Sequence, residues 1–168
     1  MKSGREKKNK IILMRILLCA TLMAFCISCS NSSRDFSKER AEITALLEQE
    51  RKAHFDRNVE LFMSEFSDSM INVNRGIVTA ATEEQHKERI GKYFGSVQFI
   101  KWDDVAEPII RFSDDGSLAY AIVQKEVIVT YPDSFGNSFT DTTNYAWVSI
   151  YRKEKGEWKV EANISTNR

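Results

Sequence analysis

Two residues in the first predicted helix have side chains that could carry out acid–base chemistry. Glu50 and His54 are four residues apart and follow Leu47 by three and seven residues, so both lie beside the apolar stripe of that helix. A carboxylate and an imidazole that face a cavity can act as an acid–base pair. The alternative is that both side chains flank the stripe, exposed or joined by one structural hydrogen bond, because glutamate is rarely fully buried.

The histidines do not predict a metal site. The chain has two of them, His54 and His86, on different predicted helices and without metal-site spacing. His86 lies among charged residues, which predicts a solvated helix face. The sequence also lacks a glycine-rich phosphate loop and a nucleophile elbow. We therefore expect no metal and no other cofactor, and the sequence holds no complete catalytic set.

The first 28 residues have the pattern of a secretory leader. Met1 to Lys10 is basic, and an uncharged run from Ile16 to Ile27 follows Arg15. This run fits the roughly 7 to 15 apolar residues of a signal sequence better than the about 20 that span a membrane. An uncleaved membrane anchor remains the alternative interpretation.

All three cysteines of the chain, Cys19, Cys26 and Cys29, lie within this leader or directly after it. Ser28 precedes Cys29 and a polar stretch follows it, which resembles a bacterial lipobox, whose cysteine is lipidated after cleavage. The resemblance implies a lipid anchor at Cys29 that holds the protein at a membrane of the bacterial cell envelope, on the periplasmic or outer-membrane face. A domain without cysteines would contain no disulfide, thiol nucleophile or cysteine-ligated metal.

The residues after the leader predict one mildly acidic domain. The chain has 24 basic and 24 acidic residues, and the leader to Ser28 holds six basic and one acidic, which leaves 18 against 23. No basic stripe with interleaved aromatic residues occurs, so nucleic acid is not an expected partner. We expect residues 29–35 to form a tether and residues 36–168 one domain, because that length suits a single hydrophobic core.

Three helices are expected in the first half of this domain. Apolar residues at helical spacing predict a first helix from Phe36 to Arg57, and Asn58 can cap a second, shorter helix through Phe66. A strand-like segment, Met70–Asn74, follows. Thr82 to Gln85 then has the form of a capping box, which opens a third helix to Phe94.

Strands dominate the rest of the chain, where β-branched and aromatic residues are separated by turn signals. The expected strands cover residues 97–112, 118–131, 138–152 and 158–165. Hairpin links make them an antiparallel meander, in which Pro108 marks an edge or a bulge. Alternation puts Val160 and Ile164 on one face of the last strand and Asn163 on the other, and leaves open which face lines a cavity. The fold class is α+β, with helices on one face of the sheet.

Several segments resemble the nuclear transport factor 2-like superfamily, and more narrowly its SnoaL-like branch of uncharacterised secreted domains. They are residues 60–68 (ELFMSEFSD), 108–121 (PIIRFSDDGSLAYA), 146–151 (AWVSIY) and 156–160 (GEWKV). The resemblance covers nearly the whole domain and implies a cone-shaped fold, in which N-terminal helices pack in a curved antiparallel sheet around a cavity. Many members dimerise through the sheet, so we expect a homodimer.

The ketosteroid isomerases of this superfamily transfer protons with a tyrosine on the first helix and a carboxylate after the first strand. Glu50 lies roughly at the tyrosine position, whereas the carboxylate position falls at residues 72–74, which hold no acid. An amide cannot act as a general base near neutral pH, so this departure argues against isomerase chemistry.

The fold implied by the resemblance would bring a set of polar and aromatic side chains to the cavity. The candidate pocket residues are Glu50, His54, Asn74, Trp102, Tyr145, Trp147 and Asn163. Aromatic side chains suit a pocket, and they suit an ordinary core or a dimer surface equally well. We expect a membrane-tethered, non-catalytic module that binds a small apolar ligand or a protein. The alternatives are a small dehydratase, isomerase or hydrolase that uses Glu50 and His54, and a fold that serves only as a dimerisation surface.

Overall fold

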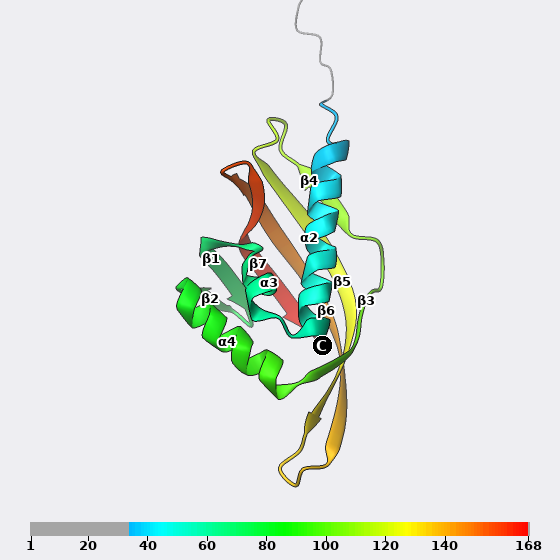
Figure 1. The fold of residues 1–168 in the computed structure, drawn as a ribbon. Helices are drawn as coiled ribbons and strands as arrows, with labels where there is room; N and C mark the ends of the chain where they lie inside the picture. Colours follow the sequence, from blue (N-terminus) through cyan, green and yellow to red (C-terminus); the bar gives the residue numbers. More distant parts are fainter. Residues whose placement is uncertain (1–33, 168) are drawn as a thin grey trace, which may run out of the picture. The chain divides into compact units, whose positions relative to one another are not determined.

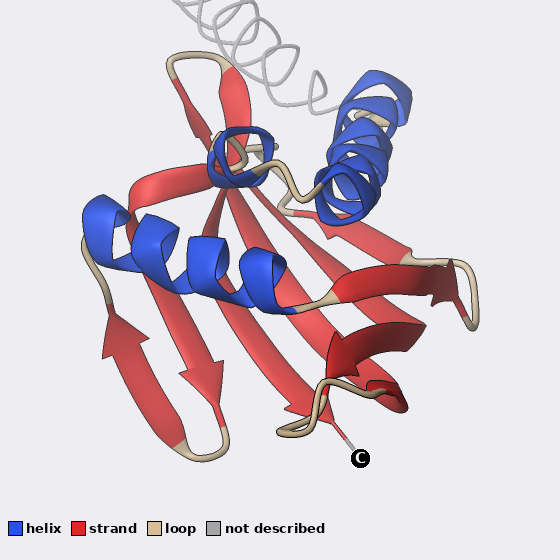
Figure 2. Cartoon of the chain, turned by 60° about the horizontal axis from the view of Figure 1, so that its bottom comes forward, coloured by secondary structure: helices blue, strands red, loops and turns tan. Residues whose placement is uncertain are grey.

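Helices cover one side of a curved, seven-stranded sheet in the computed structural model, which describes residues 34–167 (Figures 1 and 2). The predictions about the leader, about Cys29 and about most of the tether fall on residues 1–33, outside the described residues. Among the residues that the structure describes, no helix is long and apolar enough to cross a membrane.

The three helices begin and end within three residues of their predicted bounds. They are α2 (Ser37–Asp56), α3 (Val59–Met63) and α4 (Glu83–Ser96). The cap signals explain these boundaries: the Leu61 amide donates to Asn58 Oδ1 at 3.0 Å, which starts α3. Thr82 and Gln85 form the predicted capping box at the start of α4. α2 ends where Arg57 takes a left-handed conformation, with φ 51°.

The sheet has the strand order β2-β1-β7-β6-β5-β3, and β4 pairs with β5. Its strands are β1 (Phe66–Asn74), β2 (Ile77–Ala80), β3 (Gln98–Asp104), β4 (Ile109–Phe112), β5 (Leu118–Pro132), β6 (Ser138–Glu154) and β7 (Glu157–Asn167). The long strand predicted over residues 97–112 is divided into β3 and β4. Pro108, which has no amide hydrogen to donate to a ladder, lies in the gap between them.

One strand pairing makes the sheet mixed, so the prediction of a purely antiparallel sheet is wrong. β1 pairs with β7 in parallel, and the remaining pairings are antiparallel. The hairpins that join β5, β6 and β7 follow from local turn signals. β1 reaches β7 across more than half of the domain, and a parallel pair needs such a long connection.

A β-bulge in β7 changes which of its side chains face the helices. Ile150 pairs with Ala162, whereas the next residue, Tyr151, pairs with Val160, so β7 contains one extra residue at this point. Val160 and Asn163 therefore lie on the same, concave face of the sheet. The predicted alternation is wrong beyond Val160, because the period of two holds only in an unbroken ladder.

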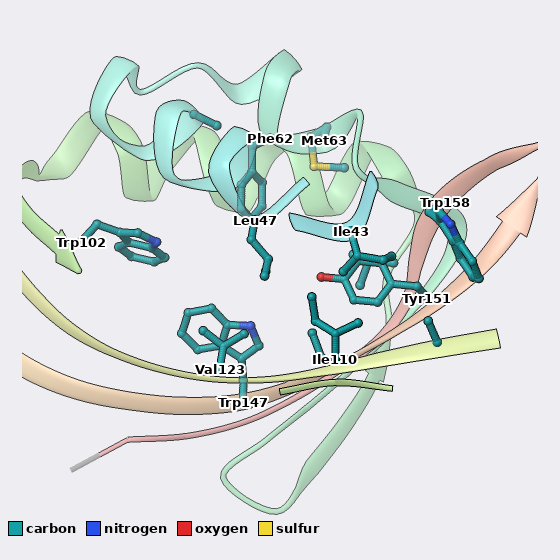
Figure 3. Packing of buried hydrophobic residues seen from close by; sticks show 14 of the residues in the cluster. Ile43, Leu47, Phe62, Met63, Trp102, Ile110, Val123, Trp147, Tyr151 and Trp158 are labelled. Atoms are coloured by element: carbon teal, nitrogen blue, oxygen red, sulfur yellow. The ribbon is translucent and has the colours of Figure 1, made fainter. Parts of the chain in front are cut away.

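The hydrophobic core lies between α2, α3 and the concave face (Figure 3). Its larger members include Ile43, Leu47, Phe62, Phe94, Phe99, Trp102, Ile110, Val123, Trp147, Tyr151 and Trp158. Odd-numbered residues of β5 and β6 face inward, and their even-numbered neighbours face outward. Val123 is 1% exposed and Ile122 is 41% exposed, which shows this alternation directly.

Candidate functional site

His54 lies inside a ring of aromatic side chains. Its imidazole stacks on the Trp102 indole with the ring centroids 3.7 Å apart. Three further rings meet it edge-on, and these are Phe62, Phe94 and Phe99. His54 Nδ1 lies 2.7 Å from the Glu50 carbonyl oxygen, so Nδ1 carries the proton and donates it. Burial lowers the pKa of His54 to about 4, and the imidazole is neutral at neutral pH.

This geometry does not join Glu50 and His54 as an acid–base pair. Their hydrogen bond uses the backbone carbonyl of Glu50, and the carboxyl group takes no part in it. The imidazole is 4% exposed and sits between aromatic rings, which suits a core residue with one structural hydrogen bond.

The Glu50 carboxyl group belongs to a different set of polar side chains, which we call the inner cluster: Glu50, Asp104, Lys125 and Tyr151. Lys125 and Tyr151 are buried, Glu50 is half-buried and Asp104 is exposed. Burial raises the pKa of Glu50 to about 7, an effect that the Lys125 ammonium group opposes and Asp104 increases. Lys125 is 2% exposed and forms an ion pair with Asp104 at 2.7 Å. Burial also raises the pKa of Tyr151, and Glu50 adds to this shift.

The inner cluster could therefore transfer protons. A carboxyl group with a pKa near 7 can accept or release a proton at neutral pH, which is what general acid–base catalysis requires. The Tyr151 hydroxyl points toward the middle of the core beneath α2 (Figure 3). Within residues 34–167, no group of three or more His, Cys, Asp or Glu side chains is arranged to hold a metal ion.

A separate pocket lies between α4 and the strands β1, β2 and β7, and we call it the amide pocket. Its volume is about 390 Å³. Its polar lining consists of Asn72, Asn74, Thr79, His86, Arg89 and Asn163. Its apolar lining consists of Phe62, Phe66, Met70, Ile77 and Ile90. In Figure 1, α4 runs beside β1 and β2, where this pocket is found.

Strand register explains why the polar side chains meet there. Asn72 pairs with Thr79 of β2 on one side and with Asn163 of β7 on the other, so the three residues form a row across neighbouring strands. Asn74 follows two residues later on the same face of β1. The bulge in β7 turns Asn163 toward this row, and without it Asn163 would face the convex side.

Two side-chain oxygens in this pocket, Asn74 Oδ1 and Asn163 Oδ1, are buried and lack a hydrogen-bond partner among the described residues. Buried polar groups are nearly always hydrogen-bonded, and leaving one unpaired costs about 1–3 kcal/mol. Unpaired acceptors in the wall of a pocket are suited to a ligand that carries hydrogen-bond donors.

Helix α4 adds His86 and Arg89 to the pocket. His86 is 5% exposed and packs against Phe66 with the ring centroids 5.1 Å apart, so the prediction of a solvated position is wrong. Its charged neighbours in sequence point elsewhere because successive helical residues are rotated around the axis. Burial lowers the pKa of His86 to about 4, and the charge of Arg89 contributes to this shift.

The structure divides the predicted pocket residues between the two regions. Asn74 and Asn163 line the amide pocket, and Glu50 belongs to the inner cluster. His54, Trp102 and Trp147 are buried in or beside the hydrophobic core, and Tyr145 packs against it partly buried.

Other residues of the two regions were not predicted as site residues, and three of them are informative. Asn72 and Arg89 line the amide pocket, and Lys125 belongs to the inner cluster. Lys125 carried a usable signal, because it alternates in phase with the inward-facing Val123 and Val127 of β5. No sequence signal distinguished Arg89, because an arginine in a charged helix segment has the pattern of an ordinary surface residue.

Solved structures share this arrangement of helices and sheet. A ketosteroid isomerase-like protein from Erwinia carotovora atroseptica matches with a TM-score of 0.63 at 18% identity, over 79% of this chain and 98% of that one. The chain has the nuclear transport factor 2-like fold. A nuclear transport factor 2-like protein from Cytophaga hutchinsonii matches with a TM-score of 0.61 at 18% identity, over 77% and 98% of the two chains.

The nuclear transport factor 2-like fold is also shared with an uncharacterised protein with a cystatin-like fold from Caulobacter vibrioides. Its TM-score is 0.59 at 16% identity, over 79% of this chain and 91% of that one. No family model and no curated protein matches the sequence. The predicted superfamily resemblance and the α+β class are confirmed at the level of the fold, and the fold by itself assigns no activity.

Proposed function

We propose that this domain is a non-catalytic binding module whose amide pocket holds a small ligand. The observation that carries the proposal is the pair of buried, unpaired oxygens, Asn74 Oδ1 and Asn163 Oδ1, in the wall of a pocket of about 390 Å³. Pockets for small ligands have volumes of about 300–1,000 Å³ and combine an apolar lining with a few well-placed polar groups.

The lining favours a ligand with an apolar body and a polar end. Phe62, Met70 and Ile90 offer apolar surface to the body, and the asparagine amides offer hydrogen bonds to the polar end. A purely apolar ligand, as expected from the aromatic residues alone, would leave the two amide oxygens unpaired at a cost of about 1–3 kcal/mol each.

The test is a ligand screen on the full-length chain in detergent. Native mass spectrometry and thermal shift across small envelope metabolites should find at least one compound that raises the melting temperature. Thr79→Trp, which places a bulky ring in the pocket row, should abolish that effect, whereas Thr140→Trp at an exposed position of β6 should keep it. Binding that survives in Thr79→Trp would refute a site in the amide pocket.

We propose that the domain is held at the bacterial cell envelope by a lipid on Cys29. The basic leader, the uncharged run from Ile16 to Ile27 and the small residue before Cys29 support this. Labelled palmitate should enter the wild-type protein, and Cys29→Ala should lose both the label and membrane fractionation. Unchanged fractionation of Cys29→Ala would refute the anchor.

We also propose that two copies of the chain associate through the convex face. Strand register aligns aliphatic side chains across six strands there, and the row is Val78, Val73, Ile164, Val148, Ile122 and Ile109. Val78 is 68% exposed and Ile109 is 47% exposed, and a continuous apolar patch is typical of an interface. Sedimentation should give a dimer that Ile122→Lys converts to a monomer, and a monomeric wild type would refute the proposal.

The inner cluster supports a second candidate function, a small acid–base enzyme that uses Glu50. The specific observation is the pKa of about 7 at Glu50, beside Lys125 and Tyr151. Turnover of an ester or enolisable ketone should then vanish in Glu50→Gln and survive in His54→Phe, because the imidazole bonds only the backbone. Equal turnover in wild type and Glu50→Gln would exclude this function.

A further inference from the structure

The geometry points to a more specific occupant of the amide pocket: a small monocarboxylate that also carries a hydroxyl or amino group. This inference rests on the proposed binding function and adds the chemical class of the ligand. It follows from two features of the lining, one at Arg89 and one at the buried amides.

Arg89 offers an anion site that nearby carboxylates do not occupy. It is exposed, and within residues 34–167 its guanidinium forms no ion pair. The nearest acid in sequence, Glu88, is bound to Lys92 at 2.6 Å. A guanidinium group can bind both oxygens of a carboxylate through two parallel hydrogen bonds, so a free arginine at a pocket favours that group.

The charge of the lining sets the charge of the ligand. Arg89 is the cationic side chain among the lining residues, and the lining includes no Asp or Glu. His86 contributes no charge at neutral pH, because burial lowers its pKa to about 4. The pocket wall therefore has a charge of about +1, which one carboxylate neutralises.

The amide oxygens set the second requirement. Asn74 Oδ1 and Asn163 Oδ1 can only accept hydrogen bonds, so they need donors from the ligand. A carboxylate has no donor to give, whereas a hydroxyl or an amino group has. The ligand therefore needs an acceptor group for Arg89 and a donor group for the asparagines on one small apolar frame.

A matched series of three compounds separates these requirements: 3-hydroxyhexanoate, hexanoate and 1,3-hexanediol. Calorimetry on the full-length chain in detergent should show 3-hydroxyhexanoate binding about tenfold or more tightly than either of the others, because each polar group adds a charge-assisted or buried hydrogen bond. The six-carbon frame is common to all three.

Two variants and one control assign the contacts. Arg89→Gln should weaken both carboxylates about tenfold and leave the diol unchanged, because only the carboxylates use the charge. Asn163→Ala should reduce the advantage of 3-hydroxyhexanoate over hexanoate to about twofold or less. Arg75→Gln removes an equal charge from the exposed β1–β2 turn, outside the lining, and should change nothing.

The outcomes distinguish this inference from the proposed function beneath it. If all three compounds bind with equal affinity and Thr79→Trp abolishes their binding, the ligand is not specifically a hydroxy- or amino-carboxylate. That result would still support a ligand site in the amide pocket. No binding of any of the three would also overturn the class. If the metabolite screen likewise found no ligand sensitive to Thr79→Trp, the binding function itself would fall.

Discussion

The same concave face is built in two ways, filled beneath α2 and left open beneath α4. Under α2, inward positions hold Val123, Trp147 and Trp102, and the Trp102 ring stacks on the neutral ring of His54. Under α4, the inward positions of β1 and β7 hold asparagines that surround a pocket. The first region contributes stability through close packing. Among the described residues, Trp102 Nε1 in the first region and the two amide oxygens in the second lack a hydrogen-bond partner, and of these three atoms only the amide oxygens belong to residues that line the amide pocket.

The largest loss of stability is expected from a substitution that removes packing in the filled region. Trp102→Ala deletes the ring stacked on His54 and should lower the free energy of unfolding by about 3–5 kcal/mol, as for other large-to-small core changes. Ile77→Ala, at a 63% exposed position of the amide pocket, should cost about 1 kcal/mol or less. Urea denaturation measures both, and equal losses would mean that the two regions do not differ in packing.

A second variant probes the border between the regions, where Glu65 is 3% exposed and its Oε1 is unpaired among the described residues. Burial raises the pKa of Glu65 to about 9, and Glu50 adds to this shift. The folded state thus keeps a proton that the unfolded state loses above about pH 4.5, so stability falls as the pH rises from there toward 9.

Glu65→Gln should therefore stabilise the domain at pH 8 by about 2 kcal/mol, because glutamine carries no ionisable proton. At pH 4 the two proteins should differ little. Thermal denaturation across this range measures the difference, with Glu84→Gln on the exposed face of α4 as the control. A gain that is the same at pH 4 and pH 8 would contradict the role of ionisation.

The opposite pH trend is expected from His54, the centre of the filled region. Its pKa is lowered to about 4, so the unfolded state binds a proton below about pH 6.5 that the folded state excludes. This stability is present above pH 6.5 and is lost as the pH falls toward 4. His54→Phe keeps an aromatic ring on Trp102. Between pH 8 and pH 5, its free energy of unfolding should fall by about 1–2 kcal/mol less than that of the wild type. Parallel pH profiles would refute a neutral buried imidazole.

The smallest expected effect is a gain of stability in the open region. Asn163→Leu replaces an amide with an unpaired oxygen by an apolar side chain of similar size, and should stabilise the domain by about 1 kcal/mol while abolishing ligand binding. Asn144→Leu on β6 lies outside the pocket lining, so it should neither stabilise the domain by as much nor abolish ligand binding. A loss of stability in Asn163→Leu would show that the pocket is as closely packed as the core.

Much of this fold could be predicted because its signals are local. Asn58 and the Thr82 capping box set helix starts, and turn signals set the hairpins of β5, β6 and β7. The parallel pairing of β1 with β7 joins segments far apart in the chain, so no local pattern indicates it. The prediction that His86 is solvated is wrong because it rested on the charged residues next to it in sequence. The two rings that pack against His86, Phe62 and Phe66, come from α3 and β1, and no local pattern indicates them.

The candidate site was predicted in part for the same reason. Asn74 and Asn163 could be named from the fold that the sequence resembles, and both line the amide pocket. The direction of Asn163 depends on the bulge, which is visible only once β6 and β7 are paired. The pKa shift of Glu50 could not be predicted from the sequence, because the charges of Lys125 and Asp104 that influence it come from β5 and β3.

The bulge also couples the two faces of β7. If Glu161 paired with Ile150 in an unbroken ladder, every later residue of β7 would shift by one position: Ala162 and Ile164 would turn inward, and Asn163 would take the place of Ile164 in the outward aliphatic row. One slip in register would thus make the pocket wall apolar and put an amide in the middle of the proposed self-association surface. What the protein binds and whether it pairs with itself would then change together.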